Sequence, residues 1–191
     1  MDLFNMLIFH PIRFDTNLFY SNFSTEAISA LIVTGEKQEI LILGIGNDIL
    51  SDDGIGPRIV EAMKRDLERE NLNYMTAASG GLDVLELISG YKTVIIIDAI
   101  KTRDGIPGDI YYLTPSSFKE TLHISSFHDV SFLTALQLGE QLDMPVPNTI
   151  HILAIEIVED LNFSTEFSPP IAEKYDSIYK KVKAAVKKLI T

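Results

Sequence analysis

From Glu39 onward, hydrophobic and polar positions follow strand-like and helix-like spacings in turn. The first apolar run, Ile40–Leu43, contains no polar residue, which is typical of a strand buried on both faces of a sheet. After it, apolar residues recur every three or four positions with charged residues between them, which predicts an amphipathic helix ending near Glu70. The apolar positions of this helix are Ile55, Ile59, Val60, Met63 and Leu67.

The same spacings predict four more strands and three more helices. The strands are expected at 74–78, 93–97, 110–113 and 149–155, and the helices at 82–88, 129–142 and 171–189. The connection between the strands at 93–97 and 110–113 is short, contains glycine and proline and has no helical pattern, so we expect these two strands to pair antiparallel. Together the elements predict an α/β fold, a three-layer α/β/α sandwich around a mixed, mainly parallel sheet of about five strands.

Residues 1–38 differ from the rest of the chain, because they are rich in aromatic side chains and show no sustained period. Asp2 stands where a signal peptide needs positive charge, and Pro11 and Arg13 cut the apolar run short, so a signal peptide is not expected. The chain of 191 residues is 46% hydrophobic, which is enough for one core. We expect a single domain over 39–191, preceded by an N-terminal extension over 1–38 that is either packed on the domain or upstream of the true start.

The composition argues against several classes of partner and of chemistry. The formal net charge is −11 at pH 7, and an acidic surface repels phosphate backbones, which argues against nucleic acid. No apolar run reaches the ~18 residues that indicate a membrane span. The chain has no cysteine, which excludes disulfides, thiolate catalysis and cysteine-ligated metal sites. These features favour a cytoplasmic protein, and its small size favours a monomer.

Residues that could carry chemistry follow the first and third predicted strands. A glycine turn, Asn47 and the acidic pair Asp52-Asp53 come after the first strand, and Asp98 ends the third. Ligands of an open α/β sheet bind beyond the carboxyl ends of its strands, so we expect these carboxylates at one edge. Other roles remain open, because Asp98 could cap a turn through its own backbone and one member of the pair could cap the next helix. The glycine turn lacks the third glycine of a dinucleotide fingerprint, so a Rossmann cofactor site is not expected.

One of the four histidines is a candidate third metal ligand beside the two carboxylates. His128 ends a polar loop just before a predicted helix, where it is either a third metal ligand or a helix-entry residue held by its neighbours. His10 falls in the extension, His123 lies inside a loop, and His151 falls within the last strand, where we expect a hydrogen-bonded core residue. Two carboxylates and one imidazole suit nickel, zinc or manganese. The HExxH helix of the zinc proteases is absent.

Taken together, these segments resemble the hydrogenase maturation endopeptidases, which process the large-subunit precursor of nickel–iron hydrogenases. The resemblance runs from about residue 39 to the end. It rests on the segments LGIGNDILSDDGIGPRIVE, SGGLDVLELI, VIIIDAI, PGDIYYL, SSFHDVSFLTAL and EFSPPI, which occur in the family's order. It implies a phosphorylase/hydrolase-like α/β/α fold and a metal-dependent, aspartate-type endopeptidase. Such an enzyme removes the C-terminal extension of the precursor after nickel is installed.

The resemblance also implies roles for individual residues. Asp53, Asp98 and His128 match the family's metal-contacting and catalytic positions, and many relatives have a glutamate where this chain has Asp53. The nickel is expected to come with the substrate. As a hypothesis, this metal polarises the scissile carbonyl or activates a bound water.

The tail of the precursor would bind nearby. We expect Asn47 to orient a substrate carbonyl, and Gly80 and Gly81 to let the tail's backbone approach closely. Two other functions use the same residues. One is a non-catalytic, nickel-sensing or chaperone-like binder of the precursor, and the other is a different hydrolase on the same fold.

Overall fold

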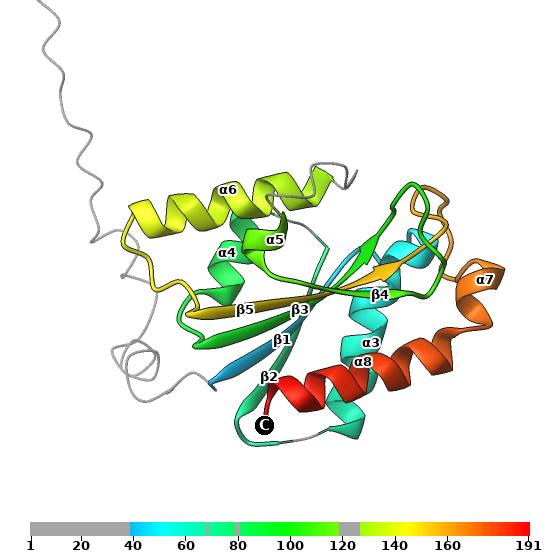
Figure 1. The fold of residues 1–191 in the computed structure, drawn as a ribbon, viewed down its shortest axis with the longest axis horizontal. Helices are drawn as coiled ribbons and strands as arrows, with labels where there is room; N and C mark the ends of the chain where they lie inside the picture. The colour runs from blue at the N-terminus through cyan, green and yellow to red at the C-terminus, as the bar shows by residue number, and fades with distance from the viewer. Residues whose placement is uncertain (1–38, 68, 79–80, 119–126) are drawn as a thin grey trace, which may run out of the picture. The chain divides into compact units, whose positions relative to one another are not determined.

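The computed structural model describes residues 39–67, 69–78, 81–118 and 127–191, so the predicted extension over 1–38 lies outside the described part. Five strands form one sheet in the order β2-β1-β3-β5-β4 (Figure 1). Their bounds are Ile40–Ile45 for β1, Leu72–Ala77 for β2, Thr93–Ile100 for β3, Ile110–Leu113 for β4 and Thr149–Glu156 for β5. The mixed five-stranded α/β architecture predicted from the sequence is confirmed.

The sheet is parallel except at one edge. β2, β1, β3 and β5 run in the same direction, and β4 pairs antiparallel with β5. The expected direction of β4 is therefore correct, but the expectation that it pairs with the strand at 93–97 is wrong, because β5 lies between them. The β3–β4 connection crosses the end of β5, where Gly108 N donates to Glu156 O and Glu156 N donates to Asp109 O.

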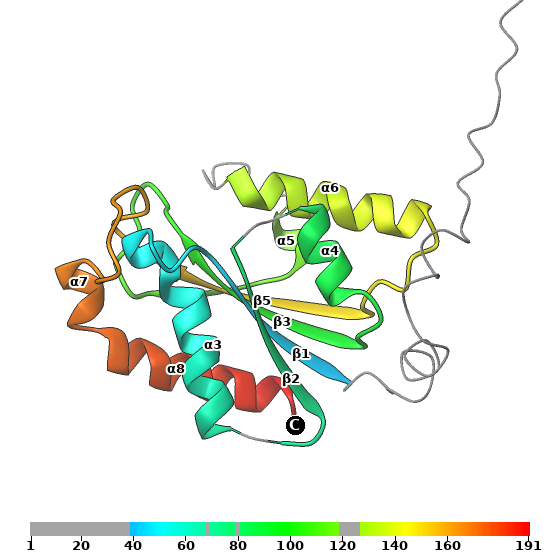
Figure 2. The same ribbon diagram turned by 180° about the vertical axis from the view of Figure 1, so that it is seen from behind.

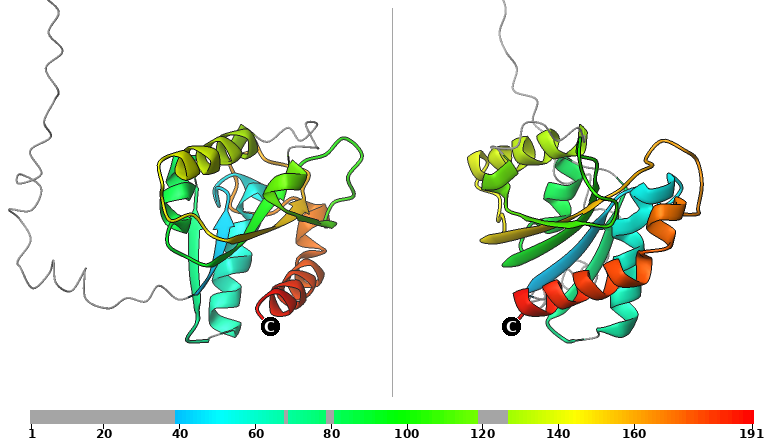
Figure 3. Two further views of the ribbon diagram at one scale, coloured as in Figure 1. Left: turned by 60° about the vertical axis from the view of Figure 1, so that its left-hand side comes forward. Right: turned by 45° about the vertical axis from the view of Figure 1, so that its right-hand side comes forward.

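Helices cover both faces of the sheet (Figures 1 and 2). α3 (Ile55–Asp66) and α8 (Tyr175–Leu189) cover one face, and α4 (Leu82–Ile88) and α6 (Phe127–Gln141) cover the other, as Figure 3 shows from two sides. Three short helices complete this part of the chain: η1 (Ser51–Gly54), α5 (Pro115–Phe118) and α7 (Pro169–Ala172). The helix predicted over 171–189 is divided into α7 and α8, because Lys174 N bonds to Ile171 O in a tighter turn.

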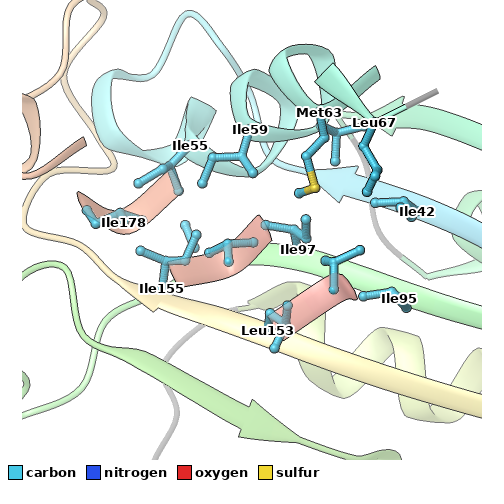
Figure 4. Packing of buried hydrophobic residues seen from close by; sticks show 14 of the residues in the cluster. Ile42, Ile55, Ile59, Met63, Leu67, Ile95, Ile97, Leu153, Ile155 and Ile178 are labelled. Atoms are coloured by element: carbon cyan, nitrogen blue, oxygen red, sulfur yellow. The ribbon is translucent and has the colours of Figure 1, made fainter. Parts of the chain in front are cut away.

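The uniformly apolar strands are explained by burial on two sides. Ile42, Ile95 and Ile97 face α3 and α8, whereas Leu43 and Ile96 face α4 and α6. Figure 4 shows Ile55, Ile59 and Met63 of α3 directed toward the sheet. Because successive side chains of a strand point to opposite faces, a strand covered on both faces needs apolar residues at every position.

His151 is the third residue of β5, as its sequence position predicted. Its Nδ1 is hydrogen-bonded to the Tyr112 hydroxyl of the neighbouring β4, and the ring is half-buried. Burial lowers the pKa of His151 below its ordinary value of 6.5. The expected hydrogen bond in the last strand is confirmed, but His151 is not a core residue, because it lies half-buried beside the edge strand β4.

The lowered pKa of His151 predicts a pH dependence of stability. The unfolded chain takes up a proton at this residue more readily than the folded chain, so its contribution to the free energy of unfolding is complete above pH 6.5 and is lost as the pH falls. We expect His151→Gln to lose less unfolding free energy than the wild type between about pH 7.5 and about pH 5. Urea unfolding at both pH values measures this difference, and equal losses in the two proteins would contradict it.

Candidate functional site

Close contact between backbones sets the position of the site. A Cβ atom at Gly56 would lie 2.4 Å from the carbonyl oxygens of both Ile45 and Ile97, and one at Gly44 would lie 2.7 Å from Gly56 O. Only glycine avoids these clashes. The first turn of α3 therefore lies directly on the ends of β1 and β3, which carries the η1 segment to the carboxyl edge of the sheet.

Asp53 is held against the turn that follows β1. Its Oδ2 accepts a hydrogen bond from Asn47 N at 2.6 Å, and the side chain is half-buried. Asn47 Oδ1 in turn accepts from Ile49 N at 3.2 Å. Gly46 permits this arrangement for two reasons. Its φ of 135° is one that other residues rarely adopt, and a Cβ atom at this position would lie 2.0 Å from Asp53 O.

Asp98 lies inside β3, so the prediction that this strand stops there is wrong. β3 pairs with β1 only as far as Ile97, but it pairs with β5 as far as Ile100. Asp98 is thus the first residue of β3 beyond the end of its pairing with β1. It is half-buried, and its Oδ1 accepts from Ala99 N at 2.8 Å, which is the local backbone contact that the sequence left open.

The topology brings these two aspartates to one edge. η1, which carries Asp53, contacts β3, which carries Asp98, and Gly56 lies over the ends of both neighbouring strands. Both carboxylates make further interactions within the molecule. Among the side chains that the structure describes, no three acidic or histidine residues converge closely enough to hold a metal ion. The described part of the chain therefore offers a pair of carboxylates, to which a third ligand would have to be added.

The remaining predicted residues are described only in part. His128 is the second residue of α6, but its side chain lies outside the described part, as does Gly80 altogether. Gly81 is buried and directly precedes α4, with a φ of 65° and ψ of −128° that suit glycine. The metal-ligand role of His128 and the substrate contacts of Gly80 and Gly81 stay predictions.

Asp52 has a role that differs from the expected helix cap. The residue that caps α3 is Gly54, with no side-chain hydrogen bond. The Asp52 side chain is instead fully buried and accepts four hydrogen bonds from a distant segment. The donors are Val158 N at 3.2 Å, Glu159 N at 3.0 Å, and both the N and the Oγ of Ser168 at 2.7 Å.

Further contacts join this segment, residues 158–168, to the neighbours of Asp52. Ser51 N donates to Ser164 O at 2.8 Å, and Ser51 Oγ donates to Glu166 O at 3.0 Å. The Arg58 guanidinium donates to Thr165 O and lies 4.3 Å from the centre of the Phe167 ring. We call residues 158–168 the stapled loop. The available signal in the sequence was Ser168, which stands before Pro169-Pro170 in the EFSPPI segment.

A second buried carboxylate orders the other loop at this edge. Glu156, at the end of β5, accepts from Thr102 N at 2.7 Å and Thr102 Oγ1 at 2.9 Å. Gly105 packs on it so closely that a Cβ atom there would lie 2.0 Å from the carboxyl carbon. Sequence reasoning missed Glu156, because the predicted strand ended one residue before it.

Comparison with known proteins identifies similar chains. The family model HycI, described as hydrogenase maturation protease, matches residues 57–185, which is more than half of the chain. A hydrogenase expression/formation protein HupD from Thiocapsa roseopersicina is 27% identical over 143 residues, covering 71% of this chain and 62% of the relative. The hydrogenase 2 maturation protease of Escherichia coli is 26% identical over 153 residues, covering 78% of this chain and 90% of the relative.

The fold is also that of a solved structure. The hydrogenase maturating endopeptidase HybD from E. coli aligns with a TM-score of 0.62 and 23% identity, covering 78% of this chain and 93% of HybD. No helix in the described part of the chain is both long and apolar enough to cross a bilayer.

The hydrogen bonds of Asp52 predict a large effect on stability. Asp52→Ala leaves three backbone N–H groups and the Ser168 hydroxyl without their acceptor, and we expect a loss of about 3 kcal/mol of unfolding free energy. Asp104→Ala, an exposed aspartate on the β3–β4 connection, is the matched control and should change it by less than about 0.5 kcal/mol. Urea unfolding measures both, and a small loss for Asp52→Ala would show that the stapled loop is not held as described.

Proposed function

The chain belongs to the hydrogenase maturation protease family, and on that basis we propose that it is an endopeptidase acting on the precursor of a nickel–iron hydrogenase large subunit. It removes the C-terminal extension of this precursor. The observation that carries the proposal is that η1, which carries Asp53, contacts β3 where Asp98 passes beyond its pairing with β1, at the edge where α/β folds bind ligands. The absence of cysteine and the small size fit a cytoplasmic monomer.

Nickel enters this proposal as part of the substrate. Carboxylate oxygens are acceptable ligands for a borderline cation, and an imidazole would complete the set. Asp53 and Asp98 bind the nickel of the loaded precursor, with His128 as the third ligand. A metal bound in this way can polarise the scissile carbonyl or lower the pKa of a water. An empty precursor offers these ligands nothing to bind, so cleavage depends on the presence of nickel.

Asn47 and the glycines serve the tail of the precursor. Asn47 Oδ1 is already used by Ile49 N, so its Nδ2 is the group that would donate to a substrate carbonyl. Gly81 has a backbone conformation that favours glycine, and we expect the lack of side chains at Gly80 and Gly81 to let the backbone of the tail approach closely. The tail then binds between the end of β1 and the start of α4.

Single substitutions test the proposed site. We expect Asp53→Asn, Asp98→Asn and His128→Ala each to lower the rate of precursor cleavage about 100-fold or more, the scale of losing a positioned catalytic group. Asp104→Asn is the control and should cleave at the wild-type rate. Gel mobility and mass of a co-expressed large-subunit precursor report cleavage, and circular dichroism confirms that each variant is folded.

Two results would contradict the proposal. Full cleavage by all three variants would remove Asp53, Asp98 and His128 from the site. A stable complex between the wild type and a precursor whose tail stays attached would identify a chaperone-like binder instead of a protease.

A further inference from the structure

The stapled loop exposes large apolar side chains. Phe163 is 84% exposed and Leu161 is 78% exposed, and Val158 and Ile49 are also exposed. Single exposed apolar residues are common on protein surfaces, but several on one short loop and its neighbour mark a surface of interaction.

This loop is ordered in spite of its exposure. Asp52 binds both ends of the loop and Ser51 binds Ser164 and Glu166 within it. Glu159 Oε1 also accepts from Leu161 N at 2.9 Å and Asn162 N at 3.1 Å. Residues that are already held in place lose little conformational entropy when a partner binds. The exposed side chains are therefore presented on a preorganised support.

The loop also adjoins the candidate site. Leu50 and Ser164 form a parallel bridge in which Ser164 N donates to Ile49 O at 3.0 Å, so Ile49 and Phe163 each stand one residue before the bridged pair. Leu50 O accepts in turn from Asp53 N at 3.1 Å. Figures 1 and 3 show the loop after β5 beside the η1 segment. The exposed apolar side chains are thus joined to Asp53 by the short backbone segment from Ile49 to Asp53.

The charge of the loop indicates the chemistry of its partner. Residues 158–168 contain Glu159, Asp160 and Glu166 but no lysine or arginine, and Asp48 is exposed on the adjoining turn. Lys101 pairs with Asp160 at 2.7 Å, and the Arg58 guanidinium donates to Thr165 O and Asp48 O, so two cations offset part of this negative charge and four carboxylates exceed them. A complementary surface would carry apolar side chains flanked by lysine or arginine.

We propose that Ile49, Val158, Leu161 and Phe163 form a docking surface for the folded body of the hydrogenase large-subunit precursor. This inference rests on the proposed function and adds the surface that selects the substrate. An apolar segment of the precursor with flanking basic residues covers these side chains, and the C-terminal tail then extends from the docked body to Asp53 and Asp98. Docking supplies binding energy without touching the reacting bond, so it acts on KM rather than on kcat.

The double substitution Leu161→Ser/Phe163→Ser tests this surface. We expect KM for the purified, nickel-loaded precursor to rise about tenfold or more, with kcat within about twofold of the wild type. Leu142→Ser is the matched control, because Leu142 is 63% exposed but follows α6, near the amino ends of the strands. Its KM should be unchanged. Added salt should raise the KM of the wild type, because the partner surface is basic.

The outcomes separate this inference from the proposed function. An unchanged KM in the double variant, or a fall in kcat alone, would overturn the docking surface while leaving the protease intact. If the wild type binds the precursor without cleaving it, the proposed function fails, and loss of that complex in the double variant still supports docking. No complex and no cleavage would overturn both. Loss of a wild-type dimer, or of a contact with residues 1–38 detected by crosslinking, would assign the surface to a different occupant and overturn the proposal.

Discussion

The buried carboxylate of Asp52 joins two parts of the chain that are 106 to 116 residues apart. Its four hydrogen bonds hold the stapled loop against η1, and the glycines at positions 44 and 56 hold η1 against the ends of β1 and β3. A buried charge is stable only when its hydrogen bonds are complete. The position of the neighbouring Asp53 therefore depends on contacts made by the last third of the chain.

This arrangement gives the two members of the acidic pair different tasks. Asp52 is buried, and its carboxylate accepts hydrogen bonds that hold the stapled loop. Asp53 is half-buried and lies at the sheet edge with Asp98. A protease for a folded precursor needs both a reactive site and a surface that recognises the body of its substrate. The stapled loop connects the proposed docking surface to the proposed site, because the Asp52 carboxylate that holds this loop stands directly before Asp53.

Sequence patterns predicted the elements better than their contacts. The apolar runs of β1 and β3 were recognisable, since a strand covered on both faces must be apolar throughout. The end of β3 was predicted too early, because pairing with β5 continues beyond Asp98 and leaves no local signal. The neighbour of β4 and the role of Asp52 depend on residues far along the chain, which no local pattern contains. The sequence placed Asp53 and Asp98 at one edge because each follows a buried apolar run that can be recognised locally, whereas their catalytic role and the place of the His128 side chain stay predictions.

The intact mass of a purified large-subunit precursor, incubated with and without this protein and with and without nickel, tests the central claim most directly. Our account predicts the loss of one defined C-terminal segment only when both the protein and nickel are present. Cleavage of the nickel-free precursor would contradict the proposed role of the metal at Asp53 and Asp98. An unchanged mass with nickel and protein both present would contradict the protease itself.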